Sequence, residues 1–277
     1  MRVVVLDAGG RPRLANLPAP EPSLEVLACG LCGSDVEKLT AAHAGEVLGH
    51  EVVVRDGARR LALVHHRPCG RCERCRSGHE STCEEFAAPT IVPGGFAERV
   101  GVAEGVEVDD ALDDARATMV EPLACVLRGA ERVPRGRVLV VGHGFVGRLF
   151  TAVLERRGDD VFAVDTDPAR AGREPDGPVE AAVVCARGAG ATAFDAVAPG
   201  GTVLVFADAG SIPAKPVYRH ELTVTGSRSA TPDAMREAAR LLPELDVPEP
   251  LVLPLERFDE GLRCFVRGEA LKVVFTP

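Results

Sequence analysis

Hydrophobic positions along the chain change their pattern near Pro122. Before that residue, short apolar runs separated by Pro and Gly predict strands over residues 2–7, 24–30, 51–54 and 61–64. Strands this short, with turns this close together, indicate a small, turn-rich β domain. No internal repeat and no low-complexity linker interrupts the pattern.

After Pro122 the pattern alternates between helical periodicity and buried strands. Residues 122–133 carry apolar side chains at the spacing of one helix face, and further helices are expected over 146–157 and 233–245. Continuous apolar runs predict strands over 137–141, 161–165, 180–186, 201–207 and 271–275. Alternation of buried strands with helices is typical of a parallel sheet that helices cover on both faces.

Composition narrows the class of protein. The 277 residues suggest about two domains, at a prior of ~150 residues each. Thirty-two basic against 41 acidic residues give a net charge of −9, and no Trp is present, so a nucleic-acid partner is not expected. The apolar runs fall short of the ~20 residues that span a bilayer, and the N-terminus lacks the features of a signal peptide. We therefore expect a cytoplasmic protein without a membrane partner.

Four of the nine cysteines form the most specific motif in the sequence. Cys69, Cys72, Cys75 and Cys83 follow the pattern C-x2-C-x2-C-x7-C. Turns of this size bring neighbouring thiolates to one ion at ~2.3 Å, and four thiolates complete a closed tetrahedral zinc site. Free thiols or an iron–sulfur cluster are the alternatives, but the spacing matches no ferredoxin pattern. The sequence therefore predicts a structural zinc. His79, in the same loop, is interpreted as a surface residue.

A second set of metal-binding side chains is dispersed in the sequence. Cys32, His50, Glu51 and Glu121 together offer one thiolate, one imidazole and two carboxylates. Such a set suffices for a catalytic zinc that keeps one position open. Taken singly, each of these residues is a weak signal.

The segment after Cys32 has both a structural and a chemical interpretation. Ser34 and Glu37, three residues apart, fit a capping box for the helix that follows. Asp35 would lie in the first turn of that helix, and could also orient a ligand histidine from behind.

A glycine-rich turn after the strand at 137–141 predicts a dinucleotide site. The turn runs Gly142, His143, Gly144, Phe145, Val146, Gly147, and Asp165 ends the next strand. In this context the glycines permit a tight turn and close approach to a pyrophosphate, while the acid binds the ribose hydroxyls. The carboxylate of Asp165 would repel a 2′-phosphate, which favours NAD over NADP. The nearby Arg170 leaves NADP as a minority interpretation. His143 is given no special role.

These motifs, in this order, make the chain resemble the zinc-containing medium-chain alcohol dehydrogenases. The resemblance covers C-G-x-C-G-S-D, G-H-E, the cysteine motif, E-P-L-A, the glycine turn and the C-terminal L-K-V-V. The E-P-L form resembles the polyol, sugar and threonine dehydrogenases of the family. An α/β fold is implied: a GroES-like β-rich catalytic domain plus a Rossmann domain with a doubly wound parallel sheet. We expect the catalytic domain at 1–122, the NAD-binding domain at 123–245, and a return to the catalytic domain at 246–277.

The resemblance also implies roles for individual residues. Cys32, His50 and one of Glu51 or Glu121 would bind a catalytic zinc, and Ser34 would accept the proton of the substrate. Lys272 lies where the family places a basic residue near the cofactor phosphates. A small alcohol or carbonyl substrate, NAD and a homo-oligomer, either a dimer or a tetramer, follow in the same way.

Departures from the family pattern keep two other functions open. Glu37 stands where many members have a histidine that passes the proton to solvent, and the segment between Asp165 and Val183 is too short for a full helix–strand–helix unit. An inactive homologue that only binds zinc and nucleotide is one alternative. An NADPH-dependent quinone or enone reductase is the other, although such reductases lack the cysteine motif.

Overall fold

The computed structural model describes residues 1–39, 43–86 and 90–277, which pack into two compact units. The first unit contains residues 1–124, 230–244 and 248–277, and the second contains residues 125–229 and 245–247. The sequence predicts that residues 230–244 belong to the nucleotide-binding domain, at 123–245. The structure assigns them to the first unit because the helix α8 (Pro232–Leu241) packs against the strand β7 (Gly105–Glu107).

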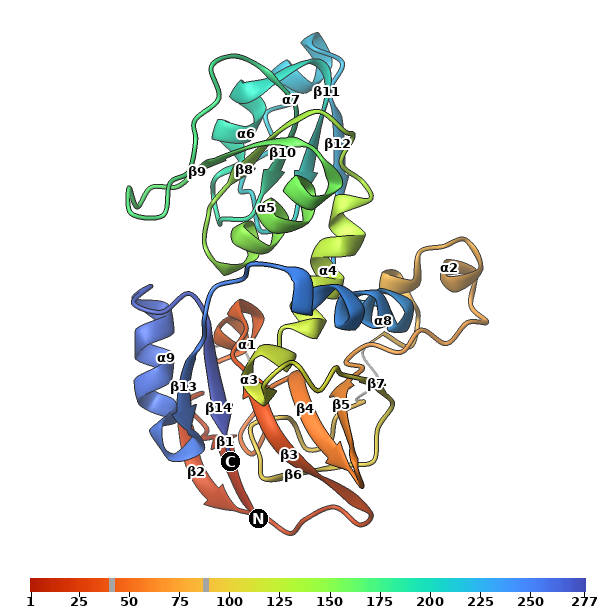
Figure 1. Cartoon of the computed structure of the whole chain (residues 1–277), viewed down its shortest axis with the longest axis vertical. Coiled ribbons are helices and arrows are strands. Elements are labelled where there is room, and N and C mark those ends of the chain that lie inside the picture. The colour runs from red at the N-terminus through yellow and green to blue at the C-terminus, as the bar shows by residue number, and fades with distance from the viewer. Residues whose placement is uncertain (40–42, 87–89) are drawn as a thin grey trace. The chain divides into compact units, whose positions relative to one another are not determined.

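Most strands of the first unit form one mixed sheet (Figure 1). Its order is β13 (Leu251–Pro254), β14 (Val273–Thr276), β3 (Ser23–Gly30), β4 (Glu51–Asp56), β5 (Arg59–Leu63) and β7, with β6 (Arg99–Gly101) also pairing with β3. A separate hairpin pairs β1 (Arg2–Leu6) with β2 (Pro12–Asn16). The sheet joins both ends of the chain, since β14 pairs with β3 through Val274 and Gly30.

Aromatic packing closes the core where the chain ends meet. Phe96, Phe258 and Phe275 contact one another with ring centroids 4.6–5.7 Å apart. Phe258 opens the helix α9 (Phe258–Val266), which sequence reasoning missed. A Cβ atom at Gly261 of this helix would lie 2.5 Å from the Phe275 ring, so only glycine allows α9 to pack this closely. The remaining helices of the first unit are short: α1 (Gly33–Lys38), α2 (Glu73–Arg76) and α3 (Asp114–Ala117).

The second unit has the parallel sheet that the apolar runs predict. Its order is β12 (Thr223–Gly226), β11 (Val197–Val205), β10 (Val179–Val184), β8 (Arg137–Val141) and β9 (Asp160–Val164), with every neighbouring pair parallel. The helices α5 (Phe145–Arg157) and α6 (Gly190–Ala196) pack on these strands, and α7 (Ala214–Arg219) precedes β12. The helix α4 (Val120–Ala130) carries the chain from the first unit into the second. The α/β fold class is therefore confirmed.

The connection after β9 is as short as the sequence indicates. Residues 165–178, all of them described, contain neither helix nor strand, and β9 is an edge strand. The loop covers this edge: Ala163 exchanges two backbone hydrogen bonds of 3.0 Å with Gly172 and Arg173. The Arg173 guanidinium also lies 4.1 Å from the centroid of the Phe162 ring. An edge covered in this way is less open to pairing with another chain.

None of the helices that the structure describes combines the length and the apolar character needed to cross a bilayer.

Candidate metal and nucleotide sites

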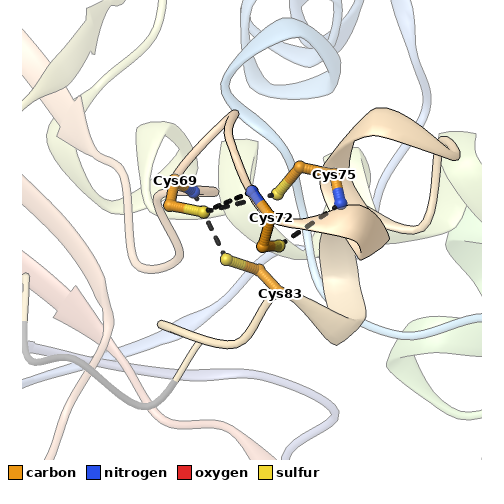
Figure 2. Close-up of side chains that lie close together, drawn as sticks. All are labelled: Cys69, Cys72, Cys75 and Cys83. Atoms are coloured by element: carbon orange, nitrogen blue, oxygen red, sulfur yellow. Dashed lines mark hydrogen bonds between the residues drawn. The ribbon is translucent and has the colours of Figure 1, made fainter.

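The four clustered cysteines converge on one point of the first unit. Their sulfur atoms lie within 4.8 Å of one another, and the Sγ atoms of Cys69 and Cys75 are 4.0 Å apart (Figure 2). A tetrahedron of four Zn–S bonds of ~2.3 Å places its sulfurs about 3.8 Å apart. We call residues 69–86 the cysteine lobe; within it, Cys83 is buried and the other three thiols are half-buried. His79 is exposed, as expected of a surface residue.

Backbone N–H groups point at the sulfur atoms of the lobe. The amides of Cys72 and Cys75 donate to the Sγ atoms of Cys69 and Cys72, at 3.3 and 3.5 Å. Cys83 accepts from the amides of Cys69 and Glu85, both at 3.3 Å. Such donors favour the thiolate, the form that binds metal. The amides of Glu84 and Cys75 lower the pKa of the Cys72 thiol to about 6. The donor set and its geometry thus fit a closed zinc site.

A second cluster forms where β3 and β4 meet. The ligand atoms of Cys32, His50 and Glu51 lie within 4.8 Å of one another. Pairing of Gly30 with Glu51 in the sheet brings the two segments together, although 18 positions separate Cys32 from His50. His50 and Glu51 are buried, with 6% and 2% of their surfaces exposed, and Cys32 is half-buried. One thiolate, one imidazole and one carboxylate form a donor set that fits a zinc with an open position.

Asp35 holds the His50 ring from behind. Its Oδ1 atom lies 3.2 Å from His50 Nδ1, and its Oδ2 atom accepts a hydrogen bond of 3.0 Å from the Cys32 amide. Burial opposes ionisation of the Asp35 carboxyl, but the neighbouring His50 lowers its pKa overall. With Nδ1 donating to Asp35, the neutral His50 ring would present Nε2, the nitrogen that a metal would bind.

The same contact corrects the expected helix cap. Cys32, in extended conformation, is the N-cap of α1, and Asp35 rather than Glu37 is the acid that bonds back to the cap amide. The capping box proposed for Ser34 and Glu37 is therefore wrong. It fails because α1 begins at Gly33, two residues earlier than that box requires. Ser34 lies half-buried in the first turn.

Lys272 makes a buried ion pair that the sequence did not suggest. Its Nζ atom bonds to Glu51 Oε2 and donates to the Leu31 carbonyl at 3.1 Å. The side chains of Lys272 and Glu51 are only 1% and 2% exposed. The ammonium group therefore lies beside the second cluster, where it neutralises one of its acids. The role of Lys272 at the cofactor phosphates stays a prediction.

Glu121 is buried in the first turn of α4. Among the described residues, the second cluster comprises Cys32, His50 and Glu51 without it. Glu51 is therefore the acid within the cluster, but its ion pair with Lys272 competes with a metal. Both acids remain candidates.

His65 is a neighbour of this cluster that sequence reasoning missed. Its ring centroid lies 4.6 Å from that of His50. Burial first, and then the adjacent His50 and His66, lower the pKa of His65 to about 2. The antiparallel pairing of β4 with β5 could have located it, because that register puts His65 directly opposite His50.

The glycine turn of the second unit gives each of its glycines a separate role. Gly142 has φ = +92°, and a Cβ atom there would lie 2.4 Å from that of Ala186. A Cβ atom at Gly147 would lie 2.1 Å from the Gly142 carbonyl oxygen, so α5 packs directly on the turn. Gly144, the N-cap of α5, has open space around it. This is the arrangement a pyrophosphate needs to reach the backbone at Phe145 and Val146.

Asp165 is fixed beside this turn by backbone donors. Its two oxygens accept from the amides of His143 and Asp167, at 2.8 and 2.9 Å. His143 is buried and contributes more than expected: its Nδ1 donates to the Arg170 carbonyl at 2.7 Å, and its Nε2 lies 3.2 Å from Thr151 Oγ1. The Arg170 guanidinium pairs with Asp167 at 3.3 Å. The Asp165 carboxylate favours NAD, and the nearby Arg170 is compatible with NADP. Both predictions of the cofactor therefore stay open.

Comparison with known proteins shows which families this chain is similar to. Residues 20–109 match the alcohol dehydrogenase GroES-like domain family. A zinc-binding dehydrogenase from Sinorhizobium meliloti 1021, solved with NADP, has the same fold: TM-score 0.85, 24% identity, 100% of this chain and 99% of the other covered. L-idonate 5-dehydrogenase from Escherichia coli aligns with a TM-score of 0.82 at 19% identity, over 100% and 98% of the two chains.

Curated relatives place the chain more closely. L-galactonate-5-dehydrogenase of Escherichia coli is 28% identical over 56% of this chain and 52% of the relative, and sorbitol dehydrogenase of Bacillus subtilis is 26% identical over 61% and 57%. D-altritol 5-dehydrogenase of Agrobacterium fabrum is 31% identical over 52% and 50%. The chain spans about half the length of the curated relatives it matches. In its fold and in these partial sequence matches, it is similar to zinc-containing medium-chain alcohol dehydrogenases.

Proposed function

We propose that this chain is a zinc-dependent oxidoreductase that transfers hydride between an alcohol and NAD. The observation that supports this most directly is the buried cluster of Cys32, His50 and Glu51, with Asp35 behind the histidine. When bound, a zinc ion would lower the pKa of the alcohol hydroxyl, and the nicotinamide would carry the hydride. Cys32 and His50 would hold that zinc together with Glu51 or Glu121. The four cysteines of the lobe would hold a second, structural zinc.

The protein side chains around the cluster then bind, orient and move a proton. Asp35 keeps the Nδ1 atom of His50 occupied, so the ring presents Nε2. Ser34 lies in the first turn of α1, two residues after Cys32, where its hydroxyl would accept the substrate proton. Glu37 is exposed on α1. It would pass that proton from Ser34 to solvent if the Ser34 hydroxyl does not itself reach solvent.

A polyol or a secondary alcohol is the substrate class we propose. The relatives named above act, by their names, on sugar acids and polyols. NAD is proposed over NADP because Asp165 stands at the turn with two oxygens that can accept from ribose hydroxyls. The nucleotide would contact the second unit through Gly142, Gly144, Phe145, Val146 and Gly147, with Arg170 and Lys272 as further candidates. We also propose a cytoplasmic location and a homo-oligomer, either a dimer or a tetramer.

One set of measurements tests the proposal. Metal analysis of the purified protein should find about two zinc ions per chain, and calorimetric titration should show tighter binding of NAD than of NADP. A panel of polyols, secondary alcohols and aldehydes should then reveal turnover with NAD. One zinc ion and no turnover would indicate an inactive homologue. No zinc and activity on enones with NADPH would indicate a reductase.

A further inference from the structure

Three ring side chains form a continuous row beside His50. The His65 ring lies 4.6 Å from that of His50, His66 lies 3.9 Å from His65, and Phe86 lies 3.7 Å from His66. All distances join ring centroids. We call His65, His66 and Phe86 the aromatic row. It leads from a candidate ligand of the second cluster to the last residue of the cysteine lobe.

The sheet sets one end of this row. In the antiparallel pairing of β4 with β5, Val53 lies opposite Ala62 and Val54 opposite Leu61. Continued by three residues, the same register puts His50 opposite His65. Directly opposed residues of an antiparallel pair have side chains on the same face and ~5 Å apart. The contact between the two imidazoles is therefore a product of strand pairing.

The cysteine lobe sets the other end. The Phe86 amide donates to the Cys83 carbonyl at 3.0 Å, so Phe86 lies one turn after a candidate ligand of the lobe. His66 stacks on the Phe86 ring at an interplanar angle of 21°, and its Nδ1 donates to the Phe86 carbonyl at 3.2 Å. The hydroxyl of Thr90 donates to the His65 carbonyl at 2.5 Å. Phe86 and Thr90 thus contact His66 and His65, respectively.

The row supplies a restraint on His50 that Asp35 does not. A single hydrogen bond at Nδ1 fixes one point of the imidazole, whereas contact with its face restricts the plane of the ring. A lobe of four thiolates closes only around its metal, because binding and folding of such sites are coupled. The metal-loaded and metal-free lobe are therefore two states, and only the loaded state fixes Cys83 and, through it, Phe86.

We propose that His65, His66 and Phe86 are positioning residues that hold the His50 ring in its metal-binding orientation and make it depend on the cysteine lobe. This inference rests on the proposed role of His50 as a ligand. It requires no contact between the row and the substrate. Metal loss in the lobe would then weaken the second cluster, even though the two share no ligand.

The test uses Co²⁺ at the second cluster of full-length protein whose lobe retains zinc. In His66→Ala the row is broken at its centre. We expect the affinity for Co²⁺ to fall about 10-fold and its visible absorption bands to shift, because partners behind a metal ligand are worth 10–100-fold in affinity. His66→Phe keeps the ring contacts and should restore both values. His79→Ala, in the same lobe but outside the row, is the matched control and should behave as wild type.

Two further variants keep the test decisive. Phe86→Leu preserves apolar volume without the ring and should show the same loss of Co²⁺ affinity and the same spectral shift as His66→Ala. It provides a second measurement in case His66→Ala does not fold. Zinc retained in the lobe, at one per chain, shows that the first unit is intact. Cys72→Ser should weaken Co²⁺ binding at the second cluster. Wild-type affinity and spectrum in His66→Ala and Phe86→Leu would overturn the positioning role, and wild-type affinity in Cys72→Ser would overturn the dependence on the lobe.

The readout separates this inference from the proposed function. Wild-type protein that binds Co²⁺ at the second cluster but oxidises no alcohol would refute the proposed activity. The variants would still test the positioning role of the aromatic row. Wild-type protein that binds no Co²⁺ there would refute both.

Discussion

The two clusters of metal-binding side chains in the first unit are built in opposite ways. The cysteine lobe draws four ligands from 15 consecutive positions, and its thiols are held by backbone amides of the same short segment. The second cluster draws Cys32 and His50 from separate segments that the sheet joins, and it is buried. A local cluster can close only with its ion, whereas paired strands hold the backbone of the second cluster before its own ion arrives. We therefore expect loss of a ligand to reduce stability in the lobe and activity in the second cluster.

Loss of a lobe ligand gives the largest expected effect. Cys83→Ser removes the buried thiol and should lower the free energy of unfolding by on the order of 5 kcal/mol, because structural zinc binding is folding free energy. The melting temperature should fall by roughly 10 °C or more. Thermal denaturation with metal analysis measures both. Arg76→Ala, an exposed substitution in the same lobe, serves as control. An unchanged melting curve with two zinc ions retained would refute the lobe as a metal site.

Loss of a ligand in the second cluster should act on turnover instead. We expect His50→Ala to lower kcat/KM by on the order of 10³-fold or more. Polarisation of the substrate oxygen by a metal lowers the activation barrier by several kcal/mol, and each ~1.4 kcal/mol changes the rate tenfold. NAD binding should persist, because the glycine turn belongs to the other unit. Steady-state kinetics and calorimetric titration of NAD on one preparation test this. Full turnover in this variant would remove His50 from the site.

The Lys272–Glu51 ion pair beside the second cluster should contribute to stability as well. Its loss therefore tests whether the second cluster affects activity alone. Lys272→Met leaves the buried carboxylate of Glu51 without its partner and should cost about 3 kcal/mol in urea denaturation. The double variant Lys272→Met, Glu51→Gln removes the unpaired charge and should recover much of that loss. If the single variant is as stable as wild type, a bound metal already neutralises Glu51, which favours Glu51 over Glu121 as the ligand.

Ser34→Ala is the smallest and most selective change. Because Ser34 is not the N-cap of α1, its hydroxyl stabilises no helix end, and unfolding should shift by no more than about 0.5 kcal/mol. Removal of a proton acceptor should still slow turnover by about 10²-fold. Stopped-flow rates and a melting curve distinguish the two effects. Normal turnover would assign proton release to Glu37 or to water.

The sequence determined the features that depend on neighbours along the chain. The spacing of the four cysteines, the glycine turn before α5 and the apolar runs of β8, β9, β10 and β11 each lie within a short segment. Chain geometry over a few residues limits such segments to few conformations. The lack of a full helix–strand–helix unit between Asp165 and Val183 also followed, because too few residues separate them.

Only the tertiary structure decided the features that depend on pairing between distant segments. The helix start at Gly33 was set by the Asp35 carboxylate, which bonds both to the Cys32 amide and to His50, and propensity alone favoured Ser34 as the cap. The pairing of β14 with β3 brought Lys272 to Glu51, 221 positions away. The register of β4 with β5 placed His65 against His50. Contacts of this kind follow from how strands align, and strand alignment is fixed by burial of the whole core.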